Sequence, residues 1–367
     1  MTYRGRFVTS RARYAVGVLV AGLLTMPSVA CTGGGPTAAD SFTVGLLLPS
    51  RVVPRWEKSD RPLIEQQVKR LCPHCSVTYA NANDDSTVQR QQMIAMITKG
   101  VRVFVLGTTD NRALRSTVQE AHNAGVPVVA YDRLAEGPIS GYVSFDGVQV
   151  GTLQGRALLK AMHAPPEGGT IVMMNGDPTS PNAAWYKRGA LSVLRGEVRI
   201  GRSYDTPGWS TDNANANMTA AISALGPGRI DGVLAANDAM AAGVVSALKS
   251  AHVRHLPPVT GQDADLDAVR RIVSGEQTMT VYKSFRAEAE AAAAMAVALG
   301  RGESLRTIAT TTTDSATTHH IPSVLLTPVA VTTANIKQTL VKDGVYTITQ
   351  ICTPQLRAAC AKAGLTP

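Results

Sequence analysis

The sequence predicts an α/β fold with parallel sheets, divided into two lobes. Short apolar runs alternate with amphipathic segments from Thr43 onward, which is the pattern of successive βαβ units. About 320 residues follow the N-terminal leader and tether, more than one ordinary hydrophobic core holds. Polar side chains gather where the apolar runs end, and open α/β folds bind ligands along that edge of the sheet.

The first series of elements runs from Thr43 to Phe145. Gly100, Gly125 and Pro127 mark the ends of its segments, because glycine and proline interrupt helices and strands. The expected strands are 43–48, 76–81, 101–106, 126–131 and 142–145, and the expected helices between them are 56–71, 84–98 and 111–123.

The second series begins at Asp146, a residue type that caps helix N-termini. Its expected strands are 170–174, 198–204, 232–235, 258–261 and 278–281, with one of its helices over 239–250.

The last segment of the chain behaves differently. An Ala-rich helix is expected over 287–300. The Thr-rich stretch 307–318 has almost no apolar period, so we expect a surface loop there. Residues 321–329 are apolar and bounded by prolines, which is consistent with a strand that passes between the lobes.

Residues 1–30 are expected to be a secretion signal peptide. They carry four arginines and no acid, and their apolar stretch 14–26 is too short to span a membrane. The Ser-Val-Ala-Cys string that ends at Cys31 resembles a bacterial lipoprotein processing box, in which this cysteine becomes the lipidated first residue. Its serine departs from the usual leucine and also fits ordinary cleavage after Ala30, so plain secretion stays open. Residues 31–42, rich in small side chains, are expected to form a tether.

The charge balance argues against a nucleic-acid partner. The chain has 36 basic and 27 acidic residues, and the leader removes four arginines, which leaves 32 minus 27, or +5. The basic residues are scattered along helical stretches and form no patch.

Four cysteines other than Cys31 form two close pairs in the sequence. Four thiols allow three connectivities, and the short separations in an oxidising exterior favour Cys72 with Cys75 and Cys352 with Cys360. The Cys-Pro-His-Cys string also occurs in some thiol oxidases. A redox dithiol needs its first cysteine at a helix N-terminus, whereas this pair follows a helix and precedes a strand, so a structural disulfide is favoured.

Polar and aromatic residues, most of them at the ends of apolar runs, form the candidate binding site. They are Arg55, Trp56, Asp132, Arg133, Asn182, Trp209, Asn237, Asp263 and Lys283. Such side chains supply hydrogen-bond donors and acceptors together with flat apolar faces, which suits a small neutral polyol. No poised nucleophile or catalytic carboxylate pair is visible, and the adjacent His319 and His320 lie on a Thr-rich stretch, so we expect no enzyme activity, no cofactor and no metal site.

Seven separated strings, in order, resemble the D-xylose-binding proteins of bacterial ABC transporters. They are Arg55-Trp56, Val129 to Arg133, Ser144 to Asp146, Ala236 to Asp238, Gly261 to Leu266, Gln277 to Lys283, and Leu325 to Pro328. The resemblance spans roughly residues 44–345. The multiple-monosaccharide-binding lipoproteins share several of the same strings.

This resemblance implies a periplasmic-binding-protein fold of the ribose-binding type. Two doubly wound lobes would be joined by three hinge crossings near Asp146, Lys283 and Leu326, with a sugar held in the cleft. The implied ranges are 43–145 with 284–325 for the N-terminal lobe, 146–283 with 326–350 for the C-terminal lobe, and 351–367 for a disulfide-bearing tail.

The resemblance also implies roles at single positions. Arg55 would donate hydrogen bonds, Trp56 and Trp209 would stack on opposite sugar faces, and Asp132 would accept from two hydroxyls while Arg133 donates beside it. The second lobe would complete the polar ring with Asn182, Asn237, Asp263 and Lys283. Ser180 departs from the aspartate typical of the family at the position two residues before Asn182. A neutral hydroxyl there replaces a charged acceptor, which leaves the exact sugar preference open.

The implied function is that of a monomeric extracytoplasmic lipoprotein that binds a monosaccharide, D-xylose first, and delivers it to a membrane permease and its ATPase. Glucose, galactose or arabinose, or a role in sugar sensing, are the alternatives. Repressors of the lactose type share the fold, but the export signal at the N-terminus excludes that class.

Overall fold

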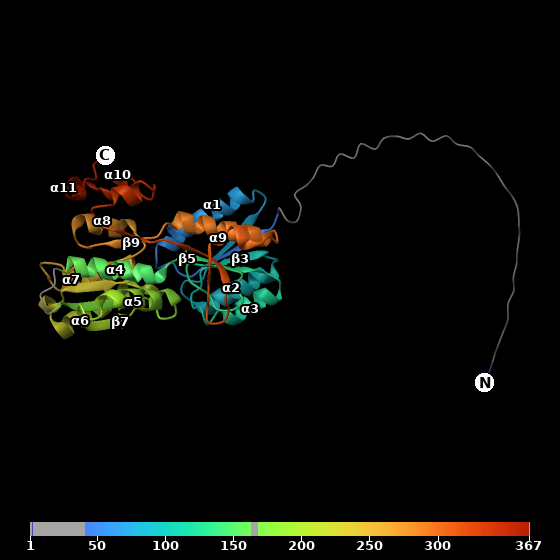
Figure 1. The fold of residues 1–367 in the computed structure, drawn as a ribbon, viewed down its shortest axis with the longest axis horizontal. Coiled ribbons are helices and arrows are strands. Elements are labelled where there is room, and N and C mark those ends of the chain that lie inside the picture. The colour runs from blue at the N-terminus through green and yellow to red at the C-terminus, as the bar shows by residue number, and fades with distance from the viewer. Residues whose placement is uncertain (1, 3–40, 163–167, 367) are drawn as a thin grey trace. The chain divides into compact units, whose positions relative to one another are not determined.

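The computed structural model describes residues 2, 41–162 and 168–366 of the 367-residue chain (Figure 1). The predicted signal peptide 1–30, Cys31 and most of the predicted tether 31–42 lie outside the described residues. Within residues 41–162 and 168–366, strands and helices alternate as predicted, and the α/β fold class is confirmed. None of the described helices is long and apolar enough to cross a membrane.

The first lobe is built on a seven-stranded sheet with the order β10-β11-β5-β4-β3-β1-β2. Its strands are β1 (Thr43–Leu48), β2 (Ser76–Asn81), β3 (Val103–Leu106), β4 (Val128–Tyr131), β5 (Gly141–Phe145), β10 (Thr311–Thr313) and β11 (Ile321–Leu326). All neighbours are parallel except β10, which is antiparallel to β11. In register, Leu46 of β1 lies between Tyr79 and Val105.

Helices cover both faces of this sheet, because its strands are apolar on both faces. Leu46 and Leu48 belong to the core that includes α1 (Arg61–Leu71) and α9 (Phe285–Gly300). Leu47 points to the opposite core, which includes α2 (Ser86–Thr98) and α3 (Arg115–Asn123). The strand period of two thus divides one run of leucines between two layers, as a doubly wound lobe requires.

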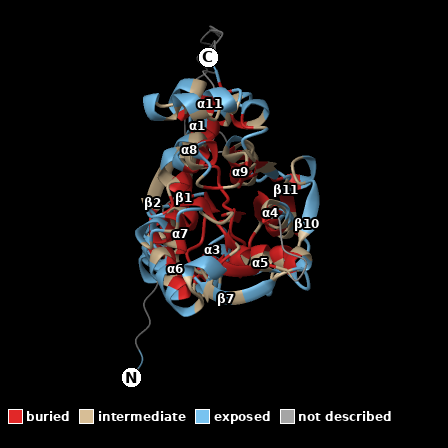
Figure 2. Ribbon diagram, turned by 90° about the vertical axis from the view of Figure 1, so that its left-hand side faces the viewer, coloured by how far each residue is buried: buried red, intermediate tan, exposed pale blue. Residues whose placement is uncertain are grey.

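The second lobe repeats this plan around a three-stranded parallel sheet with the order β7-β6-β8. Its strands are β6 (Thr170–Asn175), β7 (Arg199–Asp205) and β8 (Gly232–Ala235), and an antiparallel pair of β9 (Thr280–Tyr282) and β12 (Val329–Val331) lies beside α4. Its helices are α4 (Gly147–Ala161), α5 (Pro181–Leu194), α6 (Thr211–Leu225), α7 (Asp238–Ser250) and α8 (Leu266–Ser274). Buried residues fill the central strands and the inner helix faces, whereas the edge strands β7 and β10 are largely exposed (Figure 2).

The chain passes between the two groups of strands three times. It does so between β5 and α4, between β9 and α9, and between β11 and β12, next to the predicted positions Asp146, Lys283 and Leu326. Asp146 accepts a hydrogen bond from the backbone of Gln149 and caps α4, as predicted. The exact lobe ranges given by the sequence stay a prediction.

Two expectations for single elements are corrected. The predicted loop 307–318 contains β10, whose threonine side chains are largely exposed, so backbone pairing with β11 leaves no apolar period to reveal the strand. The predicted strand 258–261 forms only a single bridge, between Val259 and Val233 of β8.

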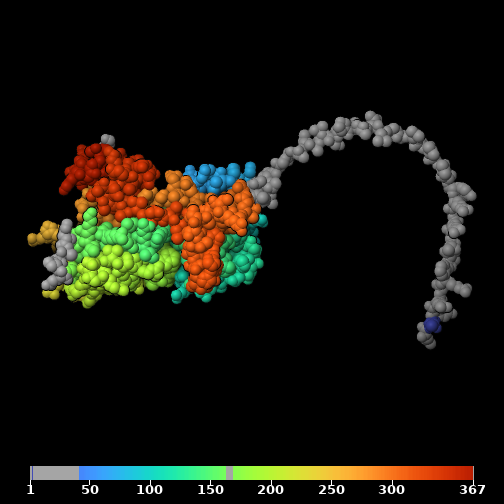
Figure 3. Space-filling model, in the orientation of Figure 1, coloured from blue at the N-terminus to red at the C-terminus, as the bar shows by residue number. Residues whose placement is uncertain are grey.

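Both predicted disulfides are present. Cys72 pairs with Cys75 between α1 and β2, and Cys352 pairs with Cys360. The second disulfide joins α10 (Ile348–Ile351) to α11 (Arg357–Lys362), and Cys360 packs in one apolar cluster with residues of α8. This C-terminal segment, red in Figure 3, lies on the surface of the second lobe.

The contact between α4 and α5 depends on two glycines. A Cβ atom at Gly151 would lie 1.9 Å from the carbonyl oxygen of Tyr186, and one at Gly189 would lie 2.0 Å from that of Val148. The two backbones therefore touch, and this contact sets the position of α5, whose first turns carry Asn182 and Tyr186.

We predict that Gly151→Ala lowers the free energy of unfolding by roughly 2 to 3 kcal/mol, because the added methyl group must push two backbones apart. Urea unfolding measures the change. Gly228→Ala is the matched control, since its Cβ would meet nothing within 4 Å. Equal stability of the two variants would contradict the close helix contact.

Candidate functional site

A small cavity lies where the two lobes meet. Residues of both lobes line it: Val53, Arg55, Trp56, Asp132, Arg133, Asn182, Tyr186, Trp209, Asn237, Gln262, Asp263 and Lys283. None of these residues is more than 5% exposed. Of the ten predicted contact residues, all except Ser180 are in the lining, so the structure brings nine of them together.

Three lining residues adopt a left-handed backbone that non-glycine residues rarely adopt. The φ angles are 59° at Asp132, 53° at Trp209 and 98° at Asp263. Local contacts hold these conformations: the backbone N–H of Asp132 donates to Val143 of β5, and that of Asp263 donates to Val281 of β9. Strain of this kind persists only where the surroundings fix it, and it concentrates at functional sites.

Arg55 is positioned by a turn of π-helix, Trp56–Asp60, which precedes α1. In such a turn the backbone bonds join residues five apart, as Arg61 N–H does to the carbonyl of Trp56. Asp60, five residues after Arg55, therefore lies next to the side chain of Arg55. Its two oxygens accept hydrogen bonds from Nε and Nη2 of Arg55 at 2.8 and 2.9 Å.

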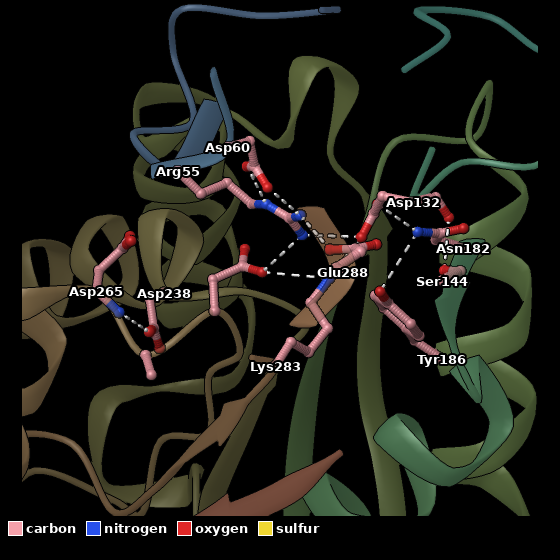
Figure 4. A network of polar contacts seen from close by, with 12 residues as sticks. Arg55, Asp60, Asp132, Ser144, Asn182, Tyr186, Asp238, Asp265, Lys283 and Glu288 are labelled. Atoms are coloured by element: carbon pink, nitrogen blue, oxygen red, sulfur yellow. Dashed lines mark hydrogen bonds and ion pairs between the residues drawn. The ribbon is translucent and has the colours of Figure 1, made fainter. Parts of the chain in front are cut away.

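Asp132 is the centre of the polar contacts (Figure 4). Its Oδ2 accepts from Nη1 of Arg55 at 2.8 Å and from Nζ of Lys283 at 2.9 Å, while its Oδ1 accepts from Nδ2 of Asn182 at 2.8 Å. Arg55 belongs to the first lobe, Lys283 to the second crossing, and Asn182 to α5 of the second lobe. A single carboxylate thus connects both lobes and the hinge.

The charged forms of Asp132 and Lys283 stabilise each other. Burial alone would raise the pKa of Asp132, but the cations of Lys283 and Arg55 outweigh it and hold this pKa far below its ordinary value. Burial alone would lower the pKa of Lys283, and the neighbouring Asp132 raises it instead. Nζ of Lys283 also lies 3.4 Å from Oδ1 of Asp263. Asp132 and Lys283 are therefore charged at neutral pH.

Two tryptophans supply the apolar part of the lining. Trp56 contacts Tyr131 edge to face, and Trp209 contacts Tyr186 in the same way. The indole of Trp209 lies over the backbone of Gly176, where a Cβ atom would come within 2.0 Å of the ring. Only glycine leaves room for the ring at that position.

Several buried polar atoms of the lining have no hydrogen-bond partner. They are Oδ1 of Asn182, Oε1 of Gln262, Oδ1 of Asp263 and the two indole Nε1 atoms of Trp56 and Trp209. A buried polar atom without a partner is costly, typically about 1 to 3 kcal/mol. The arrangement can therefore accommodate a ligand that is rich in both donors and acceptors.

The remaining predicted residues have mixed roles. Asn237 lines the cavity, but its side-chain oxygen caps α7 by accepting from the backbone of Met240. Arg133 donates to the carbonyl of Thr108. Ser180 is buried with an unpaired hydroxyl, and it lines a different hollow, which shares no lining residue with the cavity. Its predicted sugar contact gains no support from the cavity lining and stays a prediction.

The sequence reasoning missed Tyr186, Gln262 and the two carboxyl groups behind Arg55. Tyr186 lies one helical turn after Asn182, and Gln262 directly precedes Asp263, so spacing could have indicated both. Glu288 of α9 accepts from Nη2 of Arg55 at 2.7 Å across 233 residues of sequence, a contact that no local pattern reveals.

Within the described residues, no group of three or more histidine, cysteine or acidic side chains could hold a metal ion. His319 lies on the surface, 3.5 Å from a carboxylate oxygen of Asp314.

Comparison with known proteins agrees with this geometry. The periplasmic binding protein domain matches residues 44–304 of the chain. The chain belongs to this family. Its fold class and the predicted resemblance to sugar-binding proteins of the xylose type are thereby confirmed.

Two of the relatives are named as a binding protein and a receptor, not as enzymes. The D-xylose-binding periplasmic protein of Escherichia coli is 35% identical over 84% of this chain and 92% of its own length. The multiple sugar-binding periplasmic receptor ChvE of Rhizobium radiobacter is 32% identical over 86% and 93%. Among solved structures, an ABC transporter solute-binding protein from Clostridium phytofermentans with bound β-D-glucose is 29% identical, with a TM-score of 0.76 and coverage of 84% and 99%.

The protonation of Glu288 predicts a pH dependence of stability. Burial raises its pKa from 4.5 to about 8, although Arg55 opposes the shift, and its Oε1 has no partner. Between these two values the folded protein holds a proton that the unfolded chain releases, so the free energy of unfolding falls as pH rises from about 4.5 to about 8. Burial raises the pKa of Asp238 to about 7, which adds in the same direction.

Glu288→Gln keeps an acceptor for Arg55 and cannot ionise, so it should flatten this decline. Urea unfolding at a series of pH values between 4.5 and 9 measures the effect. A variant curve that runs parallel to the wild-type curve would show that Glu288 does not carry the proton.

Proposed function

We propose that this chain is the extracytoplasmic sugar-binding component of an ABC importer, and that it binds a monosaccharide, D-xylose in first place, in the cavity between its lobes. The observation that carries the proposal is the composition of the lining: two indole faces combined with unpaired acceptor oxygens and buried cations. A pyranose has apolar C–H faces and a rim of hydroxyls that both donate and accept, so it matches both parts of the lining.

The charged contacts leave defined positions for sugar hydroxyls. Lys283 uses one N–H for Asp132 and lies 3.4 Å from Oδ1 of Asp263, so its ammonium group, which has three donors, can also donate to a sugar hydroxyl. The side-chain oxygens of Asn182, Gln262 and Asp263 that lack a hydrogen-bond partner can accept from hydroxyl groups. Trp56 and Trp209 belong to different lobes and would cover opposite faces of the ring.

The contacts of Asp132 support binding by hinge closure. Asn182 and Lys283 reach this first-lobe carboxylate from the second lobe and from a crossing. A sugar that bonds to both lobes adds further contacts that exist only in the closed state, and a ligand shifts the equilibrium by that difference in affinity.

The relatives support a sugar ligand more strongly than any single sugar. The Escherichia coli relative is named for D-xylose, whereas the Clostridium phytofermentans structure holds β-D-glucose. Glucose, galactose and arabinose are therefore the alternatives to D-xylose, and a receptor that presents bound sugar to a sensor is the alternative to transport.

Delivery completes the proposal. The closed monomer would pass its sugar to a permease that is driven by an ATPase, and a lipid on Cys31 would hold the mature chain at the outer face of the cell membrane. The strings of the leader and the names of the relatives, which describe periplasmic proteins, support export. Mass spectrometry of the mature N-terminus separates lipidation at Cys31 from plain cleavage after Ala30.

The central test is calorimetry of the purified protein against pentoses and hexoses. D-xylose should bind, and Asp132→Asn should weaken binding by roughly 2 to 5 kcal/mol, about 30-fold or more, because two buried cations lose their shared carboxylate. Asp267→Ala is the control, since this carboxylate is exposed on α8, pairs with Arg270 and is outside the cavity lining. A wild-type protein that binds no pentose or hexose at millimolar concentration would contradict the proposed function.

Ser180 tests the sugar preference separately. We predict that Ser180→Asp raises the affinity for D-xylose relative to D-glucose by about 1 to 2 kcal/mol, the scale of one charge-assisted hydrogen bond after desolvation. Ser180→Ala removes only the unpaired hydroxyl and should leave the ranking of sugars unchanged. If the aspartate variant also keeps the wild-type ranking, Ser180 does not determine selectivity.

A further inference from the structure

Two buried carboxyl groups reach Arg55 from the side away from the cavity. Asp60 comes from the π-helical turn and Glu288 from the first turn of α9. Both are fully buried, and neither lines the cavity. They are close to the sugar site without access to a ligand, and the function proposed above does not use them.

Carboxyl groups accept hydrogen bonds from four of the five N–H donors of Arg55. A guanidinium has five N–H donors in a fixed plane. Asp60 accepts one from Nε and one from Nη2, Glu288 accepts from Nη2, and Asp132 accepts one from Nη1. The remaining N–H on Nη1 is on the side of Asp263, whose Oδ1 lies 3.6 Å away in the cavity lining.

Aromatic rings fix the plane of the same guanidinium. Its central carbon lies 4.5 Å from the ring centre of Trp56 and 4.2 Å from that of Phe285. Stacking restrains tilt but leaves rotation within the plane free. The carboxyl groups of Asp60 and Glu288 determine that rotation, and Tyr131 in turn donates a hydrogen bond to Asp60.

We propose that Asp60 and Glu288 are positioning residues of the sugar site, which fix the Arg55 guanidinium so that its last free N–H faces the ligand. This inference rests on the proposed function, because it concerns the same site. Without Glu288, one N–H of Nη2 would lose its acceptor in a dry interior, where an unpaired donor is costly. Arg55 would then turn toward Asp132 and Asp263, the acceptors that the sugar needs.

Calorimetry with D-xylose on the full mature protein tests the proposal. Glu288→Ala should weaken binding at least about tenfold, the scale of one coupled contact. Glu288→Gln keeps an acceptor at the same place and should stay within about threefold of wild type. The same Ala substitution in an Arg55→Met background should change the affinity less than about twofold, because the residue acts only through Arg55.

Glu136→Ala is the matched control. Glu136 is also a buried carboxylate paired with an arginine, Arg115, but it is outside the cavity lining. This variant should lose thermal stability and keep the wild-type affinity, which separates positioning from general damage to the fold. If Arg55→Met leaves no measurable binding, the positioning role is tested by the affinities of Glu288→Ala, Glu288→Gln and Glu136→Ala. Only Glu288→Ala should then bind D-xylose more weakly than wild type.

The outcomes separate the two proposals. A wild-type protein that binds no sugar overturns the proposed function. A wild-type protein that binds D-xylose, together with a Glu288→Ala variant of equal affinity, overturns only the positioning role. The positioning role is also overturned if Glu288→Ala weakens binding equally in the Arg55→Met background.

Discussion

The buried carboxylate of Asp132 accepts three hydrogen bonds, and the donors are Arg55, Lys283 and Asn182. Removing one partner of a buried charge pair commonly costs about 3 to 5 kcal/mol, because the other charge remains desolvated. This constraint ties the two lobes together: the first lobe supplies the carboxylate, and the crossing and the second lobe supply two of its donors. The closed arrangement is therefore held by the groups that would also bind the ligand.

Backbone conformation and hydrogen bonds fix the position of the Asp132 carboxylate. Asp132 has a positive φ, its N–H donates to β5, and its carbonyl oxygen accepts from the hydroxyls of Tyr142 and Ser144. The π-helical turn after Arg55 performs the same task for the guanidinium by returning Asp60 to its side. Local strain and an irregular helix are thus found at the two residues whose charges meet, which is where functional sites usually concentrate such features.

Much of the fold and most of the cavity could be predicted from the sequence because both follow short-range rules. The apolar runs predicted most strands. Nine lining residues were predicted from polar and aromatic residues, most of them at the ends of these runs, since parallel strands end at a common edge. The exceptions have physical reasons. Thr311–Thr313 pairs through its backbone with exposed side chains, so it carries no apolar period. Asp60 faces Arg55 only because the helix there is of the π type, and Glu288 arrives from a helix more than two hundred residues away. Ser180 was assigned by family position, and the cavity lining does not include it.

A crystal structure of the mature protein with D-xylose tests the central claim most directly. The account predicts one sugar ring between the indoles of Trp56 and Trp209, with its hydroxyls within hydrogen-bond distance of Asp132, Asp263 and Lys283. A sugar bound elsewhere, for example in the groove bordered by Lys58, Tyr282 and Phe285, with the contacts of Asp132 unchanged, would contradict it.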